Sequence, residues 1–72
     1  MVELFYAEDD INIADAVKEY LERKNFKVVI YNTISELRQA LEIHVPTVIL
    51  LDWNMPDGRG DSLCQWIRSR WE

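Results

Sequence analysis

The chain has 72 residues, about half the usual size of a single domain, so its length allows one domain at most. Hydrophobic residues make up 49% of it and aromatic residues 11%, a composition typical of globular rather than disordered proteins. The net charge of −5, from 13 acidic and 8 basic residues, argues against the basic face that binds nucleic acid phosphates.

The sequence also limits the compartment in which the chain is expected. Cys64 has no second cysteine with which to form an internal disulfide, as is usual in a reducing cytosol. The longest apolar run, Val45 to Leu51, is far shorter than the roughly 20 residues of a membrane span. Residues 1–6 lack the basic flank of a signal peptide. We therefore expect a soluble, cytoplasmic protein with no membrane contact.

Three apolar runs in the sequence are typical of β-strands, and charged or turn-forming residues flank each of them. The first and third are apolar at successive positions, so we expect them to be buried on both faces, as in a parallel sheet. The predicted strands are Val2–Ala7, Lys27–Tyr31 and Thr47–Leu51.

Three helices are expected, one after each strand. Asp10 is a suitable N-cap for the first, and Asn25 is a suitable C-terminal stop. Thr33 and Glu36 form a capping-box pattern at the start of the second, and the third is expected over residues 61–71. The stripes expected to face the sheet are Ile13, Val17, Tyr20 and Leu21 in the first helix, Leu37, Ala40 and Leu41 in the second, and Leu63, Ile67 and Trp71 in the third.

Strands that alternate with helices predict a three-layer α/β fold, in which helices cover both faces of a parallel sheet. Acidic residues follow two of the strands: Glu8 and Asp9 come after the first, and Asp52 after the third. The carboxyl ends of parallel strands meet at one edge, where such sheets bind ligands. If the first and third strands are neighbours, about 4.8 Å apart, the three carboxylates converge at that edge.

A cluster of three carboxylates favours a divalent cation, because the like charges repel one another without it. Mg²⁺ prefers oxygen ligands and takes one or two carboxylates together with water, carbonyl or phosphate oxygens. Acids at a helix start, such as Glu8 and Asp9, are also common as solvated residues that interact favourably with the helix dipole. Asp52 is harder to explain by packing, since burying an unpaired carboxylate is costly. The sequence therefore predicts a Mg²⁺ site at these acids.

Two segments carry a resemblance to a known family. The sequence LFYAEDD at residues 4–10 resembles the opening strand and acidic pair of response regulator receiver domains of bacterial two-component systems. The sequence PTVILLDWNMPDGRG at residues 46–60 resembles their phosphoacceptor strand and the loop after it, at a matching separation. The resemblance covers essentially the whole chain and implies the flavodoxin-like fold, with the parallel strand order 2-1-3-4-5.

The resemblance implies a role for each matching residue. Asp52 resembles the phosphoacceptor, which takes a phosphoryl group from a histidine kinase and becomes an acyl phosphate. Asp9 resembles the direct Mg²⁺ ligand, Glu8 its partner acting mainly through water, and Asn54 the position whose backbone carbonyl binds the metal. The metal would orient the phosphoryl group and neutralise charge during in-line transfer. The chain is thus expected to be a signalling switch and not an enzyme, apart from catalysis of its own phosphorylation and dephosphorylation.

The resemblance also implies parts that lie beyond the predicted elements. Receiver domains place a Ser or Thr after a fourth strand, a Lys after a fifth, and an aromatic switch residue on the fifth. We therefore expect residues 1–72 to form the N-terminal half of a receiver domain, with no second domain, and DNA to be bound only through an output domain outside this chain. Because the third strand would keep an unpaired edge, we expect a homodimer, or exchange with a second copy, through the third strand or third helix.

Three alternatives fit parts of the pattern. A phosphatase of the haloacid dehalogenase type also uses a strand-end Asp with Mg²⁺, but it has a second Asp two residues further on, where this chain has Asn54. A flavodoxin-like cofactor binder needs a phosphate loop after the first strand, where Glu8 and Asp9 would repel a phosphate. A receiver-like module that is not phosphorylated and serves in dimerisation remains open.

Overall fold

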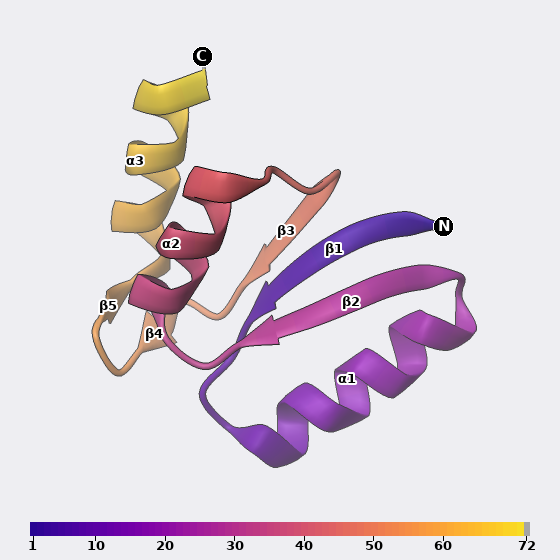
Figure 1. Ribbon diagram of the computed structural model, residues 1–72. Coiled ribbons are helices and arrows are strands. Elements are labelled where there is room, and N and C mark those ends of the chain that lie inside the picture. The colour runs from indigo at the N-terminus through magenta and orange to yellow at the C-terminus, as the bar shows by residue number, and fades with distance from the viewer. Residues whose placement is uncertain (72) are drawn as a thin grey trace.

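The structure is a computed structural model that describes residues 1–71, apart from the side chain of Trp71. Three strands, β1 (Val2–Ala7), β2 (Phe26–Tyr31) and β3 (Val48–Leu51), form a parallel sheet in the order β2-β1-β3. β1 lies in the centre and is paired on both sides (Figure 1). The predicted parallel sheet is confirmed, and its order equals that of the first three strands in the implied arrangement.

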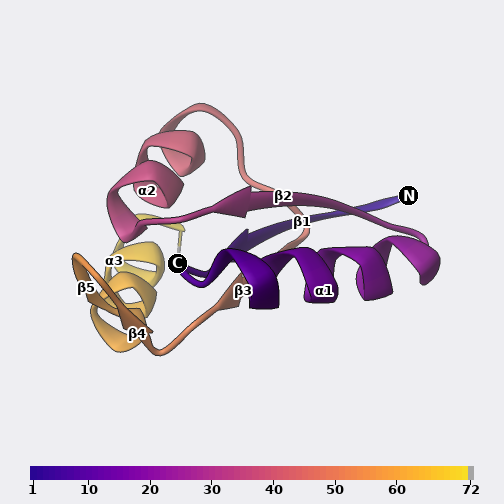
Figure 2. The same ribbon diagram turned by 90° about the horizontal axis from the view of Figure 1, so that it is seen from below.

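Three helices complete the layers. α1 (Ile11–Arg23) lies on one face of the sheet, while α2 (Ile34–Ile43) and α3 (Gly60–Trp71) lie on the other (Figure 2). This arrangement confirms the predicted three-layer α/β architecture. Within residues 1–71, no helix combines the length and the apolar character needed to cross a membrane.

Capping contacts confirm the predicted helix ends. At α1 the Asp10 carboxylate accepts hydrogen bonds from the amides of the second and third helical residues, at 3.0 and 3.2 Å. Asn25 follows α1 with a φ of 72°, the left-handed conformation in which many helices end. At α2 the Thr33 hydroxyl accepts a bond from the Glu36 amide at 3.1 Å. These side chains and turns satisfy backbone groups that the helices themselves leave unbonded.

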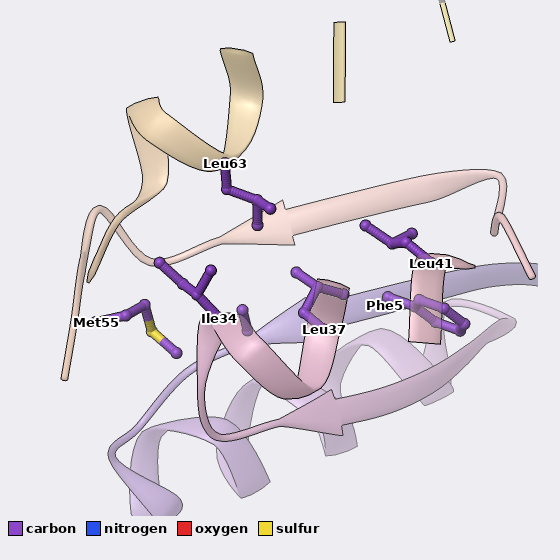
Figure 3. Packing of buried hydrophobic residues seen from close by; sticks show 7 residues of the cluster. Phe5, Ile34, Leu37, Leu41, Met55 and Leu63 are labelled. Carbon is purple, nitrogen blue, oxygen red and sulfur yellow. The ribbon is translucent and has the colours of Figure 1, made fainter. Parts of the chain in front are cut away.

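The larger core lies between the sheet and helices α2 and α3. Of the stripes predicted for these helices, Leu37, Leu41 and Leu63 are buried there, while Ala40 and Ile67 pack against this core and are partly buried. The predicted contribution of Trp71 lies outside the described residues. Figure 3 shows the buried side chains of this core, with Phe5, Ile34, Leu37, Leu41, Met55 and Leu63 labelled.

The smaller core corrects the predicted orientation of α1. Ala14 is fully buried, and Val17 and Leu21 pack beside it. In contrast, Ile13 is 49% and Tyr20 is 59% exposed. These two residues each precede a core position by one residue, which turns them about 100° away from it around the helix. The small Ala14 side chain lets the helix backbone approach the sheet closely, so the buried stripe is centred on it.

The prediction that the third strand is buried on both faces is wrong. Alternate residues of β3 face the larger core, but Val48 is 36% and Leu50 is 40% exposed. Their partners in β1, Leu4 and Tyr6, lie in the smaller core, so Val48 and Leu50 are on the α1 face of the sheet. Because α1 packs mainly over β1 and β2, it leaves this face of β3 uncovered within the described part of the chain.

The segment after β3, predicted as a loop, contains a short antiparallel hairpin. β4 (Asn54–Met55) pairs with β5 (Gly58–Arg59) around a tight turn. The Gly60 amide donates a hydrogen bond to the Trp53 carbonyl at 2.9 Å and closes the base. We call residues 53–60 the 53–60 hairpin. Its Pro and Gly residues signal a turn in the sequence, but strands this short leave no periodic pattern from which pairing could be predicted.

Candidate functional site

The ends of β1 and β3 bring acidic residues to one edge of the sheet. Ala7, the last residue of β1, lies opposite Tyr31 of β2 and Leu51 of β3. The pairing continues one residue further on both sides. The Asp52 amide donates to the Ala7 carbonyl, and the Glu8 amide donates to the Tyr31 carbonyl, each at 3.0 Å. Backbone bonds therefore fix Glu8 and Asp52 at the same level of the sheet.

Three carboxylates meet at this edge. One carboxylate oxygen from each of Glu8, Asp9 and Asp52 lies within 4.8 Å of the other two. Two unit charges at this separation repel by about 1 kcal/mol in water, and by about 3.5 kcal/mol at an effective dielectric constant of about 20. Carboxylate oxygens are the ligands that Mg²⁺ prefers, so the donor set fits such an ion. The structure thus brings together the three acidic side chains that the sequence analysis selected.

Glu8 is held by donors of the protein itself. The residue is 7% exposed, and its carboxylate accepts hydrogen bonds from the Tyr6 hydroxyl at 3.3 Å and the Asp10 amide at 3.2 Å. Burial raises the pKa of Glu8 above its ordinary value of 4.5, and the nearby Asp52 carboxylate raises it further, while the Asp10 amide opposes both effects. Burial and the adjacent Glu8 raise the pKa of Tyr6 to about 12, so the phenol remains a donor at neutral pH.

Asp52 has a different environment. It is half-buried, and its carboxylate lies beside those of Glu8 and Asp9. Among the described residues, no backbone amide and no basic side chain donates a hydrogen bond to that carboxylate. A carboxylate that is partly exposed and not engaged by protein donors is available as a metal ligand or as a nucleophile.

The 53–60 hairpin lies against Asp52 on the other side. Asn54 is exposed at the start of β4, and the metal-binding role of its backbone carbonyl stays a prediction. Gly60 packs closely, because a Cβ atom there would lie 3.2 Å from the Asp52 carbonyl oxygen. Trp53 is 54% exposed next to the acid, and the Arg59 guanidinium lies 5.9 Å from the centre of its ring. Trp53 is thus placed to report on changes at Asp52.

The tip of this hairpin is anchored on α2. The Asp57 carboxylate accepts hydrogen bonds from the amides of Ile34 at 2.8 Å and Ser35 at 2.9 Å. The Ser35 and Ile34 amides lower the pKa of Asp57 below its ordinary value of 3.8. The hairpin that follows Asp52 is therefore tied to the first turn of a helix elsewhere in the chain.

Sequence reasoning missed three residues around the site: Tyr6, Asn32 and Asp57. The period of a strand places Tyr6 and Glu8 on one side of the sheet, so Tyr6 carried a signal that could have been used. Asn32 donates from its side-chain amide to the Glu8 carbonyl at 3.2 Å. Asn32 and Asp57 each bond to a residue more than 20 positions away in the sequence, which hydrophobic periodicity does not reveal.

The sequence profile of the response regulator receiver domain family matches residues 4–72 of this chain. The chain belongs to this family. The match includes the acids after β1, the β3 strand with Asp52, and the 53–60 hairpin. Membership confirms the resemblance inferred from the two motifs.

Two named regulators are similar to this receiver chain. The transcriptional regulatory protein GltR of Pseudomonas aeruginosa is 36% identical over 66 residues, which cover 92% of this chain and 27% of that protein. The regulatory protein VanR of Enterococcus faecium is 30% identical over 67 residues, which cover 93% of this chain and 29% of that protein. The chain therefore spans less than a third of the length of either regulator.

A solved structure supports the same assignment. The non-phosphorylated HemR receiver domain from Leptospira biflexa superposes with a TM-score of 0.82 at 30% sequence identity. The superposition covers 99% of this chain and 57% of that one. The flavodoxin-like fold of receiver domains, predicted from the sequence, is confirmed for these residues.

Proposed function

We propose that this receiver chain is the phosphoacceptor part of a two-component switch, in which Asp52 receives a phosphoryl group from a histidine kinase. The observation that carries the proposal is the convergence of Glu8, Asp9 and Asp52, whose oxygens lie within 4.8 Å of one another. Of these, Asp52 directly follows β3, is half-buried and accepts no hydrogen bond from an amide of the described residues. Family membership, together with Asn54 in place of a second Asp, favours an acceptor over a phosphatase.

The chemistry follows from a half-buried carboxylate beside two further acids. An oxygen of Asp52 attacks the phosphorus of a phosphohistidine in line with the P–N bond. The new O–P bond makes an acyl phosphate while the P–N bond breaks, and the imidazole that leaves takes up a proton from solvent. A bound Mg²⁺ ion would neutralise charge as the two anions approach. Asp9 would ligate it directly, Glu8 mainly through water, and Asn54 through its backbone carbonyl.

This proposal is tested with a small phosphodonor such as acetyl phosphate in the presence of Mg²⁺. We expect the wild-type protein to gain a base-labile phosphate, detected by mass spectrometry, and the Asp52→Asn variant to gain none. Asp15→Asn, which neutralises an exposed acid of α1, is the matched control and should be modified like the wild type. Base-labile phosphate on the Asp52→Asn variant would show that the acceptor is assigned wrongly.

We further propose that the partners are those of a transcriptional response regulator. The names of GltR and VanR, and the small share of each that this chain covers, support an output domain that binds DNA outside these residues. The 57% coverage of the HemR receiver supports the view that residues 1–72 correspond to the N-terminal part of a receiver domain. On this proposal the chain acts as a switch, and any catalysis concerns its own phosphorylation and dephosphorylation.

A specific observation favours association between copies as a second function. Within the described residues, β3 has β1 on one side only, and Val48 and Leu50 expose apolar surface beside its open edge. Open apolar strand edges pair readily with other chains. In a complete receiver the fourth strand of the order 2-1-3-4-5 would cover this edge, so we infer for residues 1–72 by themselves that two copies associate through β3, by strand pairing or by exchange of an element.

Sedimentation of the protein at micromolar concentration tests this association, and we expect a dimer or a larger assembly. Leu50→Lys should shift the protein toward monomer, because a charge on an edge strand opposes pairing. Ile43→Lys, at an 88% exposed position of α2, is the matched control and should leave the assembly unchanged. A compact wild-type monomer that melts cooperatively would contradict the association.

A further inference from the structure

Two elements meet at Asp57: the tip of the 53–60 hairpin and the first turn of α2. Its two carboxylate oxygens accept from the Ile34 amide at 2.8 Å and the Ser35 amide at 2.9 Å. The N-cap residue Thr33 serves the next amide, that of Glu36, at 3.1 Å. Asp57 and Thr33 therefore each accept hydrogen bonds from amides in the first turn of α2. Of these two residues, only Asp57 belongs to the hairpin.

Contacts other than those of Asp57 also hold the hairpin in place, so loss of Asp57 should loosen the hairpin without detaching it. Met55 is buried in the core beside Ile34, and the bond between the Gly60 amide and the Trp53 carbonyl closes the base. Near the tip, a Cβ atom added to Gly58 would lie 3.2 Å from Ile34, so hairpin and helix are in close contact. Isolated two-stranded hairpins are marginally stable in water, and strands this short depend on such anchors.

We propose that Asp57 is a positioning residue of the acceptor site, because it holds the 53–60 hairpin against α2 and so fixes the backbone of Asn54 beside Asp52. Asp57 does not touch the reacting groups and acts through the hairpin. This inference rests on the proposed function, in which the Asn54 carbonyl is one of the metal-binding oxygens. If Asp57 only caps α2, its loss should affect the hairpin and Mg²⁺ binding no more than the loss of the other cap, Thr33.

A pair of cap deletions at one helix separates the two roles. Asp57→Ala and Thr33→Ala each remove acceptors from the first turn of α2, but only Asp57→Ala releases the hairpin. By calorimetry, we expect Asp57→Ala to weaken Mg²⁺ binding about tenfold, the lower end of the range for residues that support metal ligands. Thr33→Ala should bind Mg²⁺ within about twofold of the wild type, since the Thr33 hydroxyl bonds within α2 and not to the hairpin.

A conservative variant and a metal-free measurement complete the test. Asp57→Asn keeps one acceptor oxygen and should recover part of the Mg²⁺ affinity lost in Asp57→Ala. Hydrogen exchange of the Gly60 amide, followed by NMR without metal, should be faster in Asp57→Ala than in Thr33→Ala. Equal Mg²⁺ affinities of these two variants, or equal Gly60 exchange, would overturn the inference. If the wild type itself binds no Mg²⁺, the proposed function fails, and the exchange of Gly60 alone decides the role of Asp57.

Discussion

Glu8 and Asp52 follow neighbouring strands at the same level of the sheet, yet their surroundings differ. Glu8 is 7% exposed and accepts hydrogen bonds from the Tyr6 hydroxyl and the Asp10 amide. Asp52 is half-buried, and its carboxylate has acids as neighbours and no amide donor among the described residues. Protein donors therefore restrain the first carboxylate, while the second stays available to a ligand or a phosphoryl group.

This difference indicates that Glu8 and Asp52 have separate roles, one in supporting the site and the other in the reaction that we propose. The repulsion between the acids, about 1 to 3.5 kcal/mol per pair, is a large fraction of the 5–15 kcal/mol that typically stabilises a domain. A fold under selection for stability alone would lose such a cluster, whereas a functional site keeps it. The buried Glu8 fixes negative charge at the edge, and Asp52 presents the carboxylate that we propose reacts there.

The largest expected effect is on Mg²⁺ affinity, measured by calorimetry and by Trp53 emission. We expect Asp52→Asn to weaken binding more than about 100-fold, beyond the range for residues that merely support metal ligands, and Glu8→Gln to weaken it about tenfold. The reason is that Glu8 is already engaged by protein donors, whereas Asp52 is not. A greater loss in Glu8→Gln than in Asp52→Asn would reverse the comparison drawn above.

The next effect is on stability without metal. Glu8→Gln should raise the free energy of unfolding at pH 7 by about 1 kcal/mol or more, since it removes one like charge and keeps an acceptor oxygen. The folded pKa of Glu8 lies above its ordinary value of 4.5, so the wild type regains stability as pH falls from the folded pKa toward that value. Urea titrations across this range should show the advantage of Glu8→Gln shrinking with acidification. An advantage that is absent at pH 7, or that grows in acid, would contradict this account.

The strand ends were predictable because they depend on local pattern and on one rule of topology. Apolar runs located β1 and β3, and the convergence of parallel strand ends then brought Glu8 near Asp52 without any side-chain information. The tilt and rotation of α1 were not predictable in the same way. A small residue, Ala14, sets the closest approach to the sheet, and hydrophobicity alone favours the larger Ile13 at that place.

The supporting contacts were harder still to predict. Asp57 and Ile34 are 23 residues apart, and only the packing of the hairpin against α2 brings them together. The exposure of Leu50 likewise depends on how far α1 extends across the sheet. The residues of β3 alone do not indicate this. Sequence pattern thus located the acids themselves, while the groups that hold them depend on tertiary packing.

A smaller effect concerns the donor that distinguishes Glu8. Tyr6→Phe removes the hydroxyl while keeping the ring, and should lower the free energy of unfolding by about 1 kcal/mol, the typical net value of one hydrogen bond. Tyr20→Phe, at a 59% exposed position, is the control and should change stability little. The loss should shrink in a Glu8→Ala background, because the acceptor is then absent. An undiminished loss in that background would show that the hydroxyl acts elsewhere.

The smallest effect concerns the charge of Asp57, which is exposed and therefore screened by water. Asp57→Asn keeps one of the two acceptor oxygens, so it should cost one exposed hydrogen bond and the interaction of the charge with the helix end, together about 0.5 to 1 kcal/mol. The Ser35 and Ile34 amides hold the folded pKa of Asp57 below its ordinary value of 3.8. The wild-type advantage should therefore be complete above pH 3.8 and disappear as pH falls through the lower, folded pKa. Urea unfolding of both proteins, from neutral pH downward, measures the difference between their free energies of unfolding. The other acids titrate in both proteins, so their contributions cancel in this difference. An advantage that persists unchanged in strong acid would mean that the carboxylate charge plays no part in the anchor.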